Sequence, residues 1–160
     1  MSLPADQLRK VREQLAAMKG KKVSAFRKSY GRTAHAHLGQ LIPRTSLSPR
    51  AVDKDQGEYV VDLCDCDRVV ALARHEGTLS SLRDGDEPVL EAMASLVGMT
   101  VSEVSLDADS LILRFEFSEG AFLALVADRT LRPDDEQWSV TFPDGTNLIA
   151  RGWDVLGFEP

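Results

Sequence analysis

The chain has 160 residues, 43% of them hydrophobic and 28% charged, with a formal net charge of −6. This composition is that of an ordinary globular protein, and no apolar run approaches the roughly 20 residues that cross a bilayer. The length fits a single domain over residues 1–160. Two cysteines two positions apart imply no disulfide framework, and with the lack of an apolar signal segment they predict a cytoplasmic protein.

The first expected element is an amphipathic helix. Leu8, Val11, Leu15 and Met18 recur at spacings of three and four, which gives a helix one apolar face. Gly20 can adopt the left-handed conformation that ends a helix. Five strand-like stretches follow, at residues 22–27, 33–38, 41–42, 58–63 and 69–73.

The second half of the chain has the same order of elements. Val89, Met93 and Leu96 mark a helix that ends at Gly98. The Asp144-Gly145 dipeptide is typical of a hairpin turn. Strands are expected at residues 99–106, 111–117, 121–126, 138–142 and 147–150.

Two blocks of sequence match between the halves. Residues 15–26 match residues 93–104 at an offset of 78, with 4 identities in 12 positions, and residues 59–71 resemble 138–150 at an offset of 79. The matches predict an α+β fold of two pseudo-symmetric repeats, each an N-terminal helix followed by an antiparallel β-meander of about five strands. The expected bounds are 4–73 for repeat one, 74–85 for a connector and 86–153 for repeat two.

Charge is divided unevenly along the chain. Residues 1–50 hold 11 Lys and Arg against 2 acids, whereas residues 51–160 hold 8 against 23. This asymmetry predicts either an anionic partner or repeats of complementary charge that face each other, within one chain or across a homodimer. A nucleic acid or other polyanion would bind the basic stretch, which consists of Lys19, Lys21, Lys22, Arg27, Lys28 and Arg32.

The histidines and cysteines raise the question of a metal. His35 and His37, with Cys64 and Cys66, could supply two nitrogens and two thiolates to zinc. However, Cys66 aligns with the turn residue Gly145, so the two thiols are expected to straddle a bend. We therefore expect no metal and no cofactor. The chain also has no nucleophile elbow and no phosphate loop, so no catalytic residue is predicted.

Acidic residues of the second half are the remaining candidates for a binding site. Asp107, Asp109 and Glu119 fall at expected turns. A charged loop before the Trp138 strand could recognise a basic protein, with Trp138 as an aromatic anchor. The predicted binding residues are Asp128, Asp134, Asp135, Glu136 and Trp138.

The second half resembles a family of small bacterial α+β proteins. The resemblance covers residues 93–152 and rests on Gly98, Leu111-x-Leu-x-Phe115, Gly120 and Trp138-Ser-Val-Thr-Phe-Pro-Asp-Gly145. Some of these proteins are immunity proteins of toxin–antitoxin and polymorphic-toxin systems. The resemblance implies a protein that acts by binding another protein, without catalytic residues.

Three functions follow in order of preference. The first is a non-enzymatic cytoplasmic protein-binding module of the immunity type. The second is a nucleic-acid or polyanion binder that uses the basic first half. The third is a metal-binding or hydrolytic protein.

Overall fold

A computed structural model describes residues 3–28, 34–44, 55–63, 70–74, 77–79, 91–126, 132, 134–152 and 155–160. The named elements are α1 (Ala5–Ala16), β1 (Val23–Lys28), β2 (Ala34–Pro43), β3 (Asp55–Leu63), β4 (Val70–Arg74), β5 (Gly77–Leu79), β6 (Val101–Asp107), β7 (Ile112–Phe117), β8 (Phe122–Leu125), β9 (Glu136–Thr141), β10 (Asn147–Arg151) and β11 (Val155–Glu159). Residues 91–94 are also helical.

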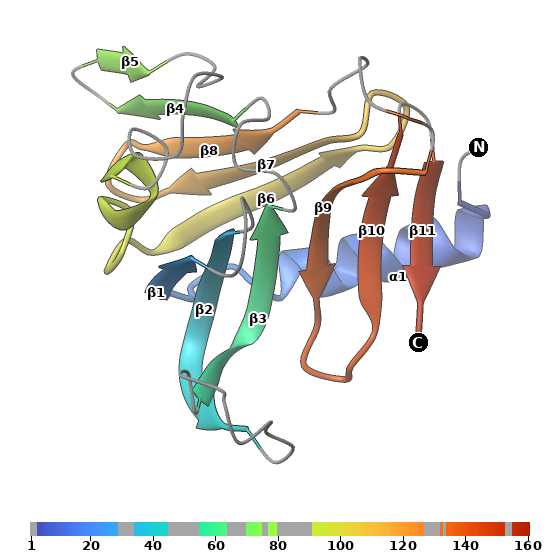
Figure 1. Ribbon diagram of the computed structural model, residues 1–160, viewed down its shortest axis with the longest axis horizontal. Coiled ribbons are helices and arrows are strands. Elements are labelled where there is room, and N and C mark those ends of the chain that lie inside the picture. The colour runs from blue at the N-terminus through green and yellow to red at the C-terminus, as the bar shows by residue number, and fades with distance from the viewer. Residues whose placement is uncertain are drawn as a thin grey trace.

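The described strands form two antiparallel sheets. One sheet has six strands in the order β1-β2-β3-β9-β10-β11, and the other has five in the order β5-β4-β8-β7-β6. Figure 1 shows the strands of the two sheets running at a steep angle to one another, with α1 behind β9, β10 and β11. The antiparallel architecture expected from the alternating sequence is therefore confirmed.

The predicted α+β fold of two helix-plus-meander repeats is wrong. The protein is mostly β, with a single α-helix among its named elements, and each described sheet takes strands from both halves of the chain. The first half contributes β4 and β5 to the sheet of β6–β8, while β9 and β10 of the second half join the sheet of β1–β3. Local alternation shows which face of a strand is apolar, but it does not select the neighbouring strand.

One of the two sequence matches does not mark equivalent positions. The stretches at 59–71 and 138–150 include β3 and β9, which are hydrogen-bonded neighbours in the six-stranded sheet, with Val61 opposite Val140. The first stretch runs from β3 into β4, which belong to different sheets, whereas the second forms the β9–β10 hairpin of one sheet. Cys66 lies outside the described residues, so its alignment with Gly145 stays a prediction. Two strands were also missed: β5 lies within the expected connector 74–85, and β11 follows the expected end of repeat two.

The match at an offset of 78 has a counterpart in the backbone. Gly20 N–H donates to Val101 O, and Gly98 N–H donates to Val23 O, each at 2.8 Å. Lys22 and Thr100 form an isolated antiparallel bridge between these bonds. Gly20 and Gly98 have φ of +86° and +90°, the left-handed conformation that favours glycine. This reciprocal contact joins the start of β1 to the start of β6.

The inward faces of both sheets share one core. Alternate residues of β3 and β7 are buried, as period-two patterns require, whereas β9 buries four consecutive residues, 137–140. Trp138, Phe115 and Phe142 are the largest fully buried side chains. The apolar face of α1 adds Val11 and Leu15, and α1 packs against β6. The helix stripe inferred from the sequence is thus a core face.

Candidate protein-binding surface

Trp138 is a core residue. Its side chain is 2% exposed, and its indole Nε1–H donates to Leu111 O at 3.1 Å. Leu111 is itself fully buried and has φ of +56°. Burial of an indole requires a partner for its N–H, and this backbone carbonyl supplies it. Trp138 therefore offers no surface to a partner in this structure.

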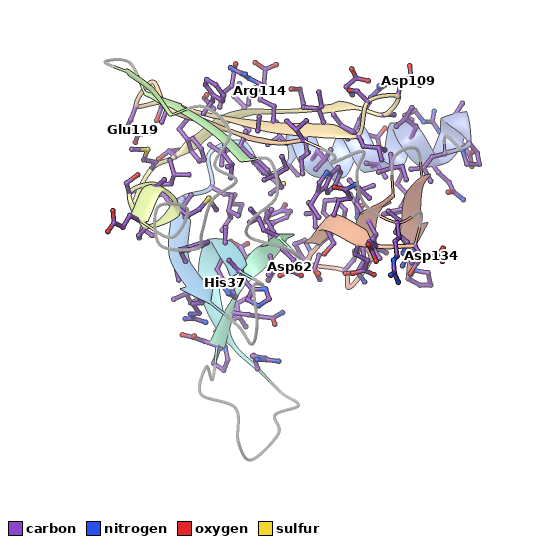
Figure 2. All side chains as sticks on the ribbon, turned by 45° about the horizontal axis from the view of Figure 1, so that its top comes forward. His37, Asp62, Asp109, Arg114, Glu119 and Asp134 are labelled. Carbon is purple, nitrogen blue, oxygen red and sulfur yellow. The ribbon has the colours of Figure 1, made fainter. Side chains whose placement is uncertain are left out.

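Two acidic residues at or just before the start of β9 have partners within the protein itself. Asp135 accepts the Arg132 N–H through Oδ2 at 3.1 Å, and Glu136 forms a 3.4 Å ion pair with Arg151. Asp134 is exposed, while Asp128 lies outside the described residues. In Figure 2, Asp134 lies beside the six-stranded sheet, away from the labelled residues of the five-stranded sheet. These predicted site residues therefore do not form one surface with Asp109 and Glu119, the acids at the turns of the five-stranded sheet.

A second group of acids lies on the β6–β7 hairpin and its flanking turns. We call this group the acidic face; its members are Glu103, Asp107, Asp109, Glu116 and Glu119. Glu116 is half-buried and the other four are exposed. Figure 2 shows Asp109 and Glu119 at opposite ends of the five-stranded sheet, with Arg114 between them.

Two members of the acidic face are cross-strand neighbours. Glu103 of β6 is the register partner of Glu116 of β7. Arg114 Nε donates to Glu116 Oε1 at 3.2 Å, but Glu103 has no polar partner among the described residues. Like charges directly opposite each other destabilise a sheet. The sequence indicated outward side chains on β7, but it could not indicate this pairing, so Glu103 and Glu116 were missed.

The Arg114 cation, which lies beside Glu116 on β7, is already engaged. The Arg114 guanidinium also lies 3.8 Å above the centroid of the Phe122 ring, a cation–π contact. At the sheet ends, Ser110 lowers the pKa of Asp107, to which its N–H donates at 3.2 Å, and the Ser118 hydroxyl lowers the pKa of Glu119. Both turn carboxylates therefore remain ionised at neutral pH.

The basic stretch is not a continuous free surface. Lys21 Nζ lies 3.1 Å from Glu58 Oε1, and Arg27 Nη2 lies 2.7 Å from Asp55 Oδ1. Lys19 and Lys22 are exposed. The Lys28 side chain and Arg32 lie outside what the structure describes. Two of the six predicted cations are thus paired with acids of β3, and polyanion binding stays a prediction.

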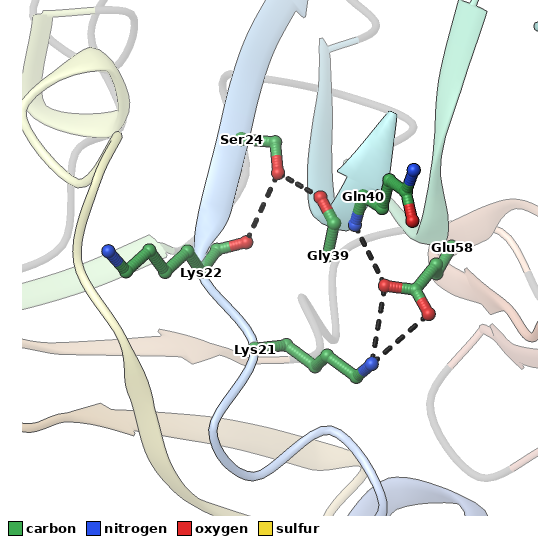
Figure 3. A network of polar contacts seen from close by, with 6 residues as sticks. All are labelled: Lys21, Lys22, Ser24, Gly39, Gln40 and Glu58. Atoms are coloured by element: carbon green, nitrogen blue, oxygen red, sulfur yellow. Dashed lines mark hydrogen bonds and ion pairs between the residues drawn. The ribbon is translucent and has the colours of Figure 1, made fainter. Parts of the chain in front are cut away.

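Glu58 reaches Lys21 by crossing over β2. Its Oε2 also accepts the Gln40 N–H at 2.8 Å, and this bond, followed by the ion pair, lowers the Glu58 pKa (Figure 3). The carboxylate passes over Gly39, where a Cβ atom would lie 2.1 Å from Oε2. Gly39 therefore provides the space for this contact, and its φ of +79° lies in the left-handed region.

His35 and His37 have different hydrogen-bond roles. His35 Nδ1 is bonded to Asp62 Oδ1, and Ser139 Oγ donates to Asp62 Oδ2 at 3.3 Å. Gly57 N–H donates to His37 Nδ1 at 3.1 Å, which assigns the proton of a neutral His37 to Nε2. Asp62 thus lies between the serine and His35, whereas a nucleophilic triad needs the histidine in the middle.

These hydrogen bonds do not favour zinc binding by His35 and His37. Only His35 has a lone pair left on Nε2, and the described residues include no group of three His, Cys, Asp or Glu that could hold a metal ion. Cys64 and Cys66 lie outside the described residues. The metal-site hypothesis therefore gains no support from His35 and His37.

The described part of the chain has no helix with the length and apolar character needed to cross a membrane. Comparisons with protein-family models, with curated proteins and with solved structures gave no match. The resemblance to immunity proteins thus stays a prediction, and the arguments about function rest on the surface itself.

Proposed function

We propose that the protein is a non-enzymatic binding module that recognises a basic protein through the acidic face. The observation that supports this most directly is the Glu103–Glu116 pair. Two carboxylates face each other on an exposed surface, and the neighbouring Arg114 already binds Glu116 and stacks on Phe122. A Lys or Arg of a partner placed between the carboxylates would offset their repulsion.

The finer proposal is that the partner is a toxin which this protein neutralises in the cytoplasm. The resemblance of residues 93–152 to immunity proteins supports it, and an inhibitor of this type needs a complementary charged surface but no catalytic residues. Co-expression with the toxin encoded beside it, if there is one, should rescue growth. Rescue that persists after charge reversal of Glu103 and Glu116 would contradict the proposed surface.

The acidic face can be tested with a defined basic probe. Calorimetry would measure binding of a Lys- and Arg-rich peptide to the wild-type protein and to two charge-matched double variants. We expect E103K with E116K to abolish most of the binding. The control, E91K with D134K, changes the net charge equally at exposed residues outside the acidic face and should retain binding.

Two results would overturn the proposal. Equal loss in both double variants would show attraction by net charge only, without a defined surface. A concentration-dependent dimer that E103K with E116K dissociates would instead make a second copy of this chain the partner, as charge complementarity between the halves predicts.

A further inference from the structure

The β3 strand is paired on one side along its whole length but on the other side only at its end. Its β2 partners extend from Pro43, opposite Asp55, to Ala34, opposite Leu63. The β9 strand pairs only with residues 60–63 of β3. Within the described residues, the β9 side of Asp55–Tyr59 therefore has no strand partner.

The turn after β9 explains why pairing stops there. Phe142 N–H donates to Thr146 O, and Gly145 N–H donates to Phe142 O, both at 2.9 Å. The next residue, Pro143, has no N–H and cannot extend the ladder. The β9–β10 hairpin thus turns away from β3 at the position where another residue pair would form.

A groove of about 460 Å³ lies between this part of β3 and the β9–β10 turn. Gln56, Gly57 and Glu58 line one side, and Phe142 and Pro143 line the other. Figure 1 shows that β2 and β3 extend beyond the rest of the sheet at this end. The groove is therefore bordered by the unpaired edge of β3.

The backbone of β3 is oriented for pairing across the groove. Gly57 N–H points toward β2, since it donates to His37 Nδ1. Successive residues of an antiparallel strand direct their peptide groups to opposite neighbours, so those of Gln56 and Glu58 point toward the groove. Two donors and two acceptors thus line an edge about 16 Å long.

Side chains at the groove define the chemistry of its occupant. Ile42, which lies opposite Gln56 in the β2–β3 register, is 48% exposed. Arg44 also lines the groove, is exposed and forms no ion pair with the described residues. An apolar side chain would cover Ile42, and a carboxylate would pair with Arg44.

We propose that this groove binds an extended segment of another protein, which adds a strand to the Asp55–Tyr59 edge of β3. The segment carries an apolar residue that covers Ile42 and an acidic residue that pairs with Arg44. Backbone hydrogen bonds supply affinity and the two side chains supply specificity, as in other strand-addition complexes. The groove is separate from the acidic face, and this proposal does not rest on the proposed function.

Selection from a library of random peptides of about six residues, the length of a typical strand, would test the proposal. Wild-type protein should enrich peptides that combine an apolar and an acidic residue. I42D should lose at least tenfold in affinity, whereas V97D, at another large exposed hydrophobic residue, should bind as the wild type does. R44E should shift the selected peptides from acidic to basic.

Strand addition has two further signatures. The Gln56 and Glu58 amides should exchange hydrogen more slowly with peptide bound. Methylation of alternate peptide nitrogens should abolish binding, while methylation of the intervening ones should not. Three outcomes would show that the proposal is wrong. No peptide is enriched, I42D and V97D bind peptide equally well, or the groove binds a second copy of this chain. E103K with E116K should leave peptide binding intact, which separates this result from the acidic face.

Discussion

Glu103 and Glu116 are direct register partners on β6 and β7, so two carboxylates face each other on the exposed side of the five-stranded sheet. Arg114 binds one of them and leaves the other without a polar partner among the described residues. The sheet carries this repulsion in the free protein. A basic partner would relieve it on binding, which links stability to recognition at the same two residues.

The first prediction concerns this pair. E103Q removes the repulsion and should stabilise the protein by about 0.2–1 kcal/mol in urea unfolding. The same change should weaken binding of the basic probe. E91Q, at an exposed residue away from the pair, is the matched control and should change neither quantity measurably. Destabilisation by E103Q would show that Glu103 has a stabilising contact.

The second prediction concerns Gly39. G39A imposes a left-handed φ on a residue with a side chain and displaces the Glu58 carboxylate, so we expect a loss of about 2–4 kcal/mol in unfolding free energy. G145A is the control, because Gly145 has φ of +86° but open space around its Cβ position. It should cost only about 1–2 kcal/mol. Equal losses would mean that the Glu58 contact contributes nothing.

The third prediction concerns pH. The Glu58 pKa is lowered in the folded protein by the Gln40 N–H and by Lys21. Its stabilising contribution is therefore complete above the unfolded value of about 4.3 and is lost as pH falls through the folded pKa. The free energy by which wild type exceeds E58Q should be larger at neutral pH than in acid. A difference that does not vary with pH, measured by urea unfolding, would contradict this.

The fourth prediction separates the structural role of Trp138 from a role in binding. W138F removes the indole N–H and leaves the Leu111 carbonyl without this donor, at a cost of about 1–3 kcal/mol. The folded variant should still bind the basic probe with wild-type affinity. Loss of binding in a variant that retains its fold by circular dichroism would restore Trp138 as a candidate anchor.

Most strand positions could be predicted from the sequence, with β5 and β11 as exceptions, but strand partners could not. The alternation of Leu111, Leu113, Phe115 and Phe117 depends on local geometry alone and placed β7 correctly. The placement of β9 beside β3 depends on contacts between residues far apart in the sequence, such as Leu63 opposite Trp138. The similar sequences of β3 and β9 predict corresponding strands of two repeats, whereas the two strands are neighbours in one sheet.

The candidate surfaces were predictable only in part. Acids at turns, including Asp107 and Glu119, could be identified from their neighbours in the sequence. The Glu103–Glu116 pair depends on register, and the groove beside β3 depends on where β9 turns away at Pro143. The Lys21–Glu58 ion pair also needs the carboxylate to cross Gly39 between β1 and β3. Each of these relationships joins residues that are far apart in the sequence, so no single segment of the sequence could indicate it.

The exchange of strands between the two halves bears on how the chain folds. Each sheet contains three consecutive strands from one half and at least two from the other, so neither sheet can be completed from one half alone. During synthesis, β3 stays without its β9 neighbour until residue 141 has left the ribosome. Such long-range closure is typical of slow, cooperative folding and leaves strand edges exposed meanwhile. Separately expressed halves would therefore acquire their structure only by associating with each other.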